Sequence, residues 1–316
     1  MTKKKHIKLV LKFAVSLFFL WWIIFQVNWV EVWEYLQKIS VWNLLAFVLV
    51  YILGVALSTY KWRRLAMHKD INFSFWVFFK SYYTAIFINN FMPSFIGGDS
   101  FKIYKIGKDN NKYKEAASSV IMDRLTGLFG AIILALFFSL VNLGNIWDNK
   151  FLFSINVIML SGLILWFLVI KFFGSREIKT SFSRINKIIN TSINEINSYN
   201  GKSNELKKAT LFSLLFNFVG VAGVNYILFW SMGIDIRVLD YLSIIFLISI
   251  VSSIPISINN IGIKEWAYIT FFGFFGLNPT AVISVAIVSR IIQMIISFFA
   301  LPIYLNDRKV KVRNQF

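Results

Sequence analysis

Long apolar stretches constrain this chain more than any other feature. Six of them, each of about 19 residues or more, carry few charged side chains: 9–27, 42–60, 116–141, 151–173, 209–232 and 280–305. An α-helix needs about 20 such residues to cross the hydrocarbon core of a bilayer. Hydrophobic residues fill 57% of the 316 positions and charged residues 15%, whereas water-soluble domains have about 45–50% and about 25%. We therefore expect an all-α polytopic membrane protein with about six full transmembrane helices.

Two further apolar stretches, 73–101 and 241–276, are interrupted near their middles. The first is broken by Pro93-Ser-Phe-Ile-Gly-Gly-Asp99, and the second by Pro255-Ile-Ser-Ile-Asn-Asn-Ile-Gly-Ile-Lys-Glu265. Proline lacks a backbone N–H donor and ends a helix, and glycine allows a tight reversal. The sequence therefore predicts two re-entrant helical hairpins, with breaks at Pro93, Pro255 and Gly262.

Basic loops predict the side from which each hairpin enters. Residues 61–72 and 102–115 are both basic and flank the first hairpin, so the positive-inside rule places both in the cytoplasm. The second hairpin lies between the acidic segment 233–240 and a last span whose basic tail is cytoplasmic, so it enters from outside. On this topology 26 of the 33 Lys and Arg residues are cytoplasmic, as are both termini, in a multi-pass protein of the cell membrane. The net charge of +18 then follows from topology, and no nucleic-acid partner is needed to explain it.

The longest cytoplasmic connection, 174–208, has apolar residues at helical spacing with basic residues between them. This pattern favours an amphipathic helix that lies on the anionic lipids of the inner leaflet. A helix that packs on the protein's own cytoplasmic face fits the pattern equally well.

The two hairpins, each followed by a span, suggest an inverted repeat within a single integral membrane domain, 1–316. The units are 61–141 and 233–305, and transporters often have this layout. In the first, Asp99 precedes Arg124 by 25 positions (124 − 99), and in the second, Glu265 precedes Arg290 by 25 (290 − 265). The equal spacing supports the repeat.

Charged residues inside the apolar stretches are the candidate site. An ionisable side chain at mid-membrane is costly, so it is normally paired or lines a wet cavity. We expect the two acids and the two arginines of the repeat to converge on one polar cavity that holds a zwitterionic or anionic lipid headgroup, with two lysines contacting its phosphate as point charges. The residues of this site are Gly97, Gly98, Asp99, Lys102, Asp123, Arg124, Lys264, Glu265 and Arg290.

Structural interpretations of the same residues stay open. Asp123 and Arg124 lie near the cytoplasmic end of their span and could anchor it at the membrane surface. Asp99 and Glu265 could satisfy the backbone N–H groups of broken helices.

The sequence lacks the residues that several kinds of chemistry require. There is no phosphate-binding Gly-x-x-x-x-Gly-Lys-Ser/Thr loop, no aminoacyl-transferase motif and no cysteine. His6 and His68 are the two histidines, and both lie in basic segments, so we expect no metal site and no catalytic triad. We expect no catalytic residues and no cofactor.

Three motifs resemble a known family: Pro93-Ser-Phe-Ile-Gly-Gly-Asp-Ser-Phe-Lys-Ile-Tyr104, Ala117-Ser-Ser-Val-Ile-Met-Asp-Arg-Leu-Thr-Gly-Leu128 and Ser253-Ile-Pro-Ile-Ser-Ile-Asn-Asn-Ile-Gly-Ile-Lys-Glu265. They are similar to the flippase-like family that includes the transmembrane region of lysylphosphatidylglycerol synthases, over nearly the whole chain. The resemblance implies that modified phospholipids or isoprenoid-linked lipids are moved between leaflets, without lysyl transfer. The family's polar motif residues fall on Gly97, Gly98, Asp99, Asp123, Arg124, Gly262 and Glu265. Lys102 and Lys264 stand where the family commonly has arginine, which affects headgroup preference.

The leading hypothesis is therefore a lipid flippase or transporter with a polar cleft between two hairpins. One alternative is a membrane enzyme that transfers a glycosyl or phosphoryl group to a lipid carrier, with Asp99 or Glu265 as base. Another is a scaffold for a lipid or envelope biosynthetic enzyme. A homo-oligomer or a biosynthetic enzyme partner is compatible with each hypothesis.

Overall fold

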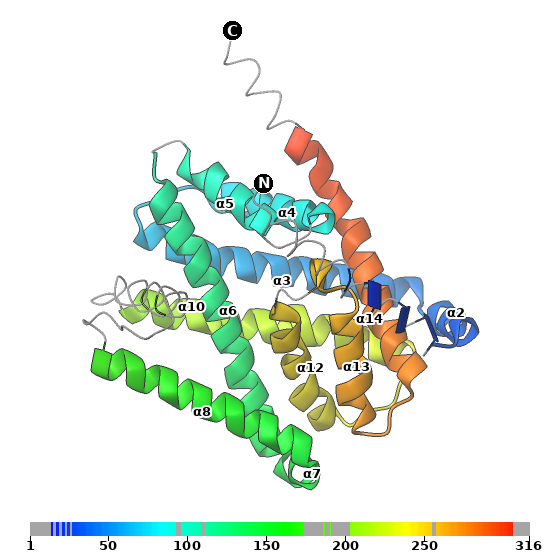
Figure 1. The fold of residues 1–316 in the computed structure, drawn as a ribbon. Coiled ribbons are helices and arrows are strands. Elements are labelled where there is room, and N and C mark those ends of the chain that lie inside the picture. The colour runs from blue at the N-terminus through cyan, green and yellow to red at the C-terminus, as the bar shows by residue number, and fades with distance from the viewer. Residues whose placement is uncertain are drawn as a thin grey trace.

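The structure, a computed structural model, describes residues 14, 17–18, 21–22, 24–25, 27–92, 96–108, 111–173, 186, 190, 203–254 and 257–305. Within these residues every regular element is a helix, as predicted (Figure 1). The elements are α2 (Trp29–Gln37), α3 (Val41–His68), α4 (Phe75–Phe91), α5 (Ile96–Gly107), α6 (Tyr113–Val141), α7 (Leu143–Asp148), α8 (Lys150–Phe173), α10 (Ser203–Leu215), η1 (Phe216–Gly223), α11 (Val224–Ser231), α12 (Val238–Ser253), η2 (Ile258–Asn260), α13 (Ile263–Gly273), α14 (Pro279–Ser297) and η3 (Phe298–Ala300).

Four helices in the described part of the chain are long and apolar enough to cross a membrane: Val41–His68, Tyr113–Val141, Asn204–Ser231 and Pro279–Leu305. They correspond to four of the six predicted spans, and they make the chain a multi-pass membrane protein. The span predicted at 151–173 is helical as α8, of which Lys150–Leu165 forms a shorter apolar helix. The span predicted at 9–27 lies largely outside the described residues, so the count of six stays a prediction.

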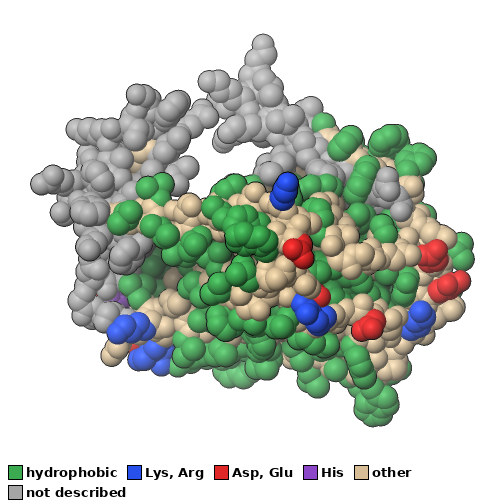
Figure 2. Space-filling view, turned by 90° about the horizontal axis from the view of Figure 1, so that it is seen from below, with side chains coloured by type: hydrophobic (Ala, Val, Ile, Leu, Met, Phe, Trp, Pro, Cys, Tyr) green, Lys and Arg blue, Asp and Glu red, His purple; other side chains and the backbone are tan. Residues whose placement is uncertain are grey.

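The long helices begin at ordinary capping residues and expose apolar side chains along their length. Ser40 caps α3 by accepting a hydrogen bond from the Asn43 N–H, and Asn278 caps α14 ahead of Pro279. Large apolar side chains cover much of the surface (Figure 2), among them Leu49 of α3 and Ile158 of α8. A water-soluble protein rarely exposes apolar patches of this extent, so these surfaces fit contact with lipid.

Each interrupted stretch forms two short helices that pack against each other, α4 with α5 and α12 with α13. Neither pair contains a helix as long as the spans. Between α12 and α13 the chain reverses through Asn259, Asn260 and Gly262, whose φ angles are 47°, 56° and 86°. Pro93 and Pro255 lie outside the described residues. The side of the membrane from which each pair enters stays a prediction.

The two units have the same order of elements and pack on each other reciprocally. A long helix that begins before the predicted bounds of 61–141 and 233–305 precedes each short pair, and another long helix follows it, so each unit of the structure includes its preceding helix. The helix after the first pair, α6, packs along α12 of the second pair, and the helix after the second pair, α14, packs on α4 of the first. The two preceding helices, α3 and the continuous α10–η1–α11, lie side by side (Figure 1).

Two glycines bring the backbones of these preceding helices into contact. A Cβ atom on Gly54 would lie 2.5 Å from the Cα of Gly220, so the helix backbones touch. Gly54 and Gly220 are 166 positions apart (220 − 54), the same offset that separates Asp99 from Glu265 (265 − 99). The backbone contact therefore joins equivalent positions of the two units.

The connection predicted as an amphipathic helix, 174–208, lies mostly outside the described residues. Its last residues, from Ser203, open α10.

Candidate functional site

The first predicted acid and arginine form an ion pair between α5 and α6. Asp99 lies in the first turn of α5, where the helix dipole favours a negative charge. Its Oδ2 atom accepts a hydrogen bond from the Nε of Arg124 at 2.5 Å. The Arg124 side chain is 48% exposed, so the pair lies at the edge of an open space.

The two glycines before Asp99 allow α5 to lie close to α4. A Cβ on Gly98 would lie 2.5 Å from the backbone oxygen of Ala85, and a Cβ on Gly97 would meet the side chain of Met92. The N–H of Gly98 donates to the Asn89 side chain at 2.9 Å. The Gly98 N–H is therefore already used by Asn89 and is not open to a ligand.

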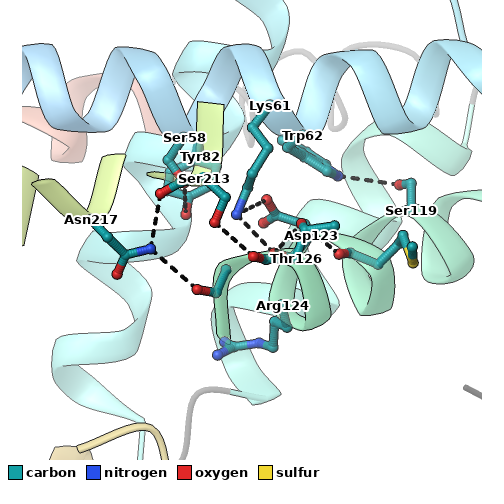
Figure 3. Close-up of polar contacts among 12 residues, drawn as sticks. Ser58, Lys61, Trp62, Tyr82, Ser119, Asp123, Arg124, Thr126, Ser213 and Asn217 are labelled. Atoms are coloured by element: carbon teal, nitrogen blue, oxygen red, sulfur yellow. Dashed lines mark hydrogen bonds and ion pairs between the residues drawn. The ribbon is translucent and has the colours of Figure 1, made fainter. Parts of the chain in front are cut away.

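Asp123 holds two lysines in a buried cluster, and Figure 3 shows its contacts with one of them, Lys61. Its Oδ1 atom lies 3.0 Å from the Nζ of Lys61, and its Oδ2 atom lies 2.9 Å from the Nζ of Lys102. All three side chains are at most 5% exposed. The ammonium of Lys102 also lies over the rings of Trp62 and Tyr82, at 4.5 and 4.4 Å from their centroids. Asp123 is therefore a buried counter-ion for both lysines.

Lys61 is a residue of this cluster that the sequence analysis missed. The sequence places Lys61 in the cytoplasmic loop that follows the apolar stretch 42–60. In the structure, α3 continues to His68 and holds Lys61 against α6. Its ammonium also donates to the backbone oxygen of Asp123 at 2.8 Å. The signal available in the sequence was its position directly after an uninterrupted helical pattern, without a proline or glycine to end the helix.

The second acid and arginine pair between α13 and α14. Glu265 is buried, and its Oε1 lies 2.9 Å from an Nη of Arg290. Glu265 also accepts a hydrogen bond from the Gly262 N–H at 2.7 Å, which is the structural role that the sequence left open for it. Arg290 donates as well to the backbone oxygens of Asn259 and Asn260. This arginine therefore fixes the reversal between α12 and α13.

Two adjacent cavities lie between the units. The larger, of about 470 Å³, is lined by both residues of the first pair and by the lysine cluster: Asp99, Arg124, Lys61, Lys102 and Asp123. The smaller, of about 370 Å³, is lined by Lys264 and by several amide and tyrosine side chains. Volumes of this size are usual for ligand pockets.

The cavities share a wall made by α4, η1 and α12. Tyr82, Asn89, Phe216 and Ser249 line both of them. The prediction of one cavity in which all four acid and arginine residues meet therefore differs from the structure. Asp99 and Arg124 line the larger cavity, whereas Glu265 and Arg290 line neither and support the backbone beside the smaller one.

The polar residues of the smaller cavity were also missed from the sequence. Asn225 accepts a hydrogen bond from the Tyr268 hydroxyl at 2.9 Å, and Gln293 and Asn90 come from α14 and α4. Uncharged polar residues are common in loops and helices alike, so nothing in the sequence separated these from others.

The described residues contain no group of three or more His, Asp or Glu side chains that could hold a metal ion. The cavities instead offer ammonium, guanidinium, amide and hydroxyl groups, which suit a phosphate or another polar headgroup.

A family comparison covers nearly the whole chain. The model of the lysylphosphatidylglycerol synthase transmembrane region matches residues 9–300. No curated protein matches the chain, and no solved structure does. The match includes both short helix pairs, both acid and arginine pairs and the residues around the cavities. The chain belongs to the family of the transmembrane region of lysylphosphatidylglycerol synthases.

Proposed function

We propose that this protein moves a phospholipid or an isoprenoid-linked lipid between the leaflets of the cell membrane. The headgroup would pass through the two polar cavities while the acyl or isoprenoid chains stay in the bilayer. One observation carries the proposal: equivalent ion pairs, Asp99 with Arg124 and Glu265 with Arg290, join each short helix pair to the long helix that follows it, beside cavities with polar walls.

The reciprocal packing of the units supports alternating access as the mechanism. We propose that the short pairs are re-entrant, with the first entering from the cytoplasm and the second from outside, and that both termini are cytoplasmic. Rocking of one unit against the other would then open the cavities to each side in turn. Short helices at membrane depth are tolerated where they are buried in protein or line a wet cavity, and the described ends of both pairs lie beside these cavities.

The ion pairs favour transport over group transfer. A general base must be within reach of a substrate proton and able to accept it. Asp99 is held by Arg124, and Glu265 is held by both Arg290 and the Gly262 N–H, so each carboxylate is already neutralised. We therefore propose that neither carboxylate acts as a base.

Leaflet exchange in liposomes tests the proposal. The purified protein is reconstituted with fluorescent phospholipids or a fluorescent polyprenyl phosphate, and dithionite bleaching measures exchange. We expect exchange faster than in empty vesicles, and a loss of about tenfold or more in Asp99→Asn and Arg124→Gln, since each breaks the ion pair between α5 and α6. The exchanged double variant, Asp99→Arg with Arg124→Asp, restores the pair and should recover part of the rate.

Lys80→Gln is the matched control, because Lys80 is exposed on α4 and lines neither cavity. It should exchange lipid at the wild-type rate. The proposal fails if no lipid moves faster than in empty vesicles, or if the Asp99 and Arg124 variants match the Lys80 control.

A further inference from the structure

Lys264 is a cation without a carboxylate partner among the described residues. It lies in the first turn of α13, and its ammonium is 5.7 Å from the ring centroid of Tyr268. The neighbouring acid, Glu265, is engaged by Arg290. In the part of the chain that the structure describes, no carboxylate oxygen lies within 4.0 Å of the Lys264 ammonium.

Among the described residues that line the smaller cavity, Lys264 has the only charged side chain. Around Lys264 its polar lining consists of amide and hydroxyl side chains, from Asn89, Asn90, Gln293 and Tyr51 among others. The Asn89 amide uses its oxygen for the Gly98 N–H, which leaves its nitrogen as a donor. These neutral groups can hydrogen-bond a ligand, but they cannot neutralise an ammonium.

The larger cavity has nearly balanced charges with a small positive excess. Its lining contains three cations, Lys61, Lys102 and Arg124, and two carboxylates, Asp99 and Asp123. Over both cavities the described lining therefore has four positive groups and two negative ones.

The Lys264 side chain is half-buried. A charge that has lost part of its hydration and has no partner is costly, and binding of an opposite charge offsets that cost. An anionic headgroup would neutralise Lys264, whereas a headgroup with a net positive charge would meet a like charge and find no free carboxylate. Phosphate esters suit this site because an ammonium binds them as a point charge, and amide N–H groups can donate hydrogen bonds to the remaining phosphate oxygens.

We propose that the Lys264 cavity binds the phosphate ester of an anionic lipid and selects against lipids whose headgroup has a net positive charge, such as aminoacylated ones. This inference rests on the proposed transport function and names the substrate class for it. Because the cavities share a wall, the phosphate would pass between Lys264 and the cations of the larger cavity.

Binding of short-chain lipids tests the proposal without requiring transport. Isothermal titration calorimetry of the full chain in detergent would use dihexanoyl phosphatidylglycerol, farnesyl phosphate, dihexanoyl phosphatidylcholine, dihexanoyl lysylphosphatidylglycerol and inorganic phosphate. We expect at least one of the two anionic lipids to bind about tenfold or more tightly than the zwitterionic and cationic ones. The tighter of the two identifies the phospholipid or the isoprenoid source, and tighter binding of inorganic phosphate than of either would overturn a lipid ligand.

Variants separate a role in binding from a role in folding. Lys264→Gln should weaken anionic lipid binding about tenfold or more while changing phosphatidylcholine binding less than about twofold, and Lys264→Arg should retain the preference. The Lys80→Gln variant is the control. If Lys264→Gln fails to fold, the order of ligand affinities of the wild type and of Lys264→Arg still tests whether the cavity prefers anionic lipids.

The inference and the proposed function fail in different ways. The inference is overturned if lysylphosphatidylglycerol binds as tightly as the anionic lipids, or if Lys264→Gln leaves the order of affinities unchanged. Charge-selective binding that depends on Lys264, without leaflet exchange, would overturn transport and leave the anion site intact. Leaflet exchange that depends on Asp99 but is equally fast for anionic and cationic headgroups would support transport and overturn the anion site.

Discussion

Asp123 is shared by two ammonium groups inside the membrane domain. With Lys61 and Lys102 on its two oxygens, the cluster has an excess positive charge, and it is almost fully buried. Removing one partner of a buried ion pair costs more than the pair contributes, because the remaining charge stays desolvated. The cluster ties α3 and α5 to α6, so its loss affects three helices.

Asp123→Asn should therefore destabilise the protein strongly. The substitution leaves two buried lysines without a counter-ion, and we expect a loss of about 3–5 kcal/mol in the free energy of unfolding. Lys102→Met keeps one lysine paired with Asp123 and should cost less. Denaturant titration in detergent micelles measures both losses.

The exposed acid Asp148, in α7, provides the matched control. Asp148→Asn should change stability by no more than about 0.5 kcal/mol. Equal stability of the Asp123 and Asp148 variants would show that the buried cluster contributes nothing to folding.

For single residues, the sequence predicted the pair of Asp99 with Arg124 but did not predict that Lys61 pairs with Asp123. The pairing of Asp99 with Arg124 follows from a repeated spacing, which is visible in one dimension. The partner of Asp123 depends on which helix packs on α6, and the positive-inside rule assigned Lys61 to a loop together with Arg63 and Arg64. Pairings between helices require the tertiary structure.

The breaks between helices were easier to predict than the contacts between helices. The predicted span at 116–141 agrees with α6, and both interruptions separate two short helices as expected. The predicted span at 42–60 ended two turns early, because hydropathy falls at the first basic residue while the backbone continues as a helix to His68. The π-helix η1 in the third long helix gave no signal, since its residues are as apolar as their neighbours.

The glycine contact between α3 and η1 should tolerate no side chain. In Gly54→Ala the new methyl group would lie 2.5 Å from the backbone of Gly220. Small residues at helix contacts in membranes allow close backbone approach, and overpacking typically costs about 1–3 kcal/mol. We expect a loss of stability in that range, measured by the same denaturant titration.

Gly162→Ala in α8 is the comparison, because a Cβ there has no atom within 4 Å. It should be neutral or stabilise the helix by up to about 1 kcal/mol. Equal effects of the two substitutions would mean that the helices can separate at Gly54 without loss.

The described part of the molecule contains two units with the same order of elements, besides α2, α7 and α8, and its topology has a direct test. If the first short pair enters from the cytoplasm and the second from outside, the turns that lead into them lie on opposite sides of the membrane. Ser74 precedes α4 and Asp235 precedes α12, and both are exposed. The chain contains no cysteine, so single cysteines can be introduced without other changes.

A membrane-impermeant maleimide should label the two positions from opposite sides. We expect Ser74→Cys to react in inside-out vesicles and Asp235→Cys in intact spheroplasts. Detergent-solubilised protein, in which both should react, controls for accessibility. Labelling of both from the same side would exclude entry from opposite faces.

The backbone contact at Gly54 and Gly220 also bears on how the two units can move. Helices that meet through interdigitated side chains resist rotation, because each step must unpack a close-packed layer. At Gly54 and Gly220 the two backbones meet without side chains, whereas elsewhere the same helices meet through side chains, as at Tyr60 and Phe212, whose ring centroids lie 4.4 Å apart. Both glycines line the smaller cavity, and Phe216, one turn before Gly220, lines both cavities. Any movement of η1 against α3 at this contact would therefore change the walls of both cavities together.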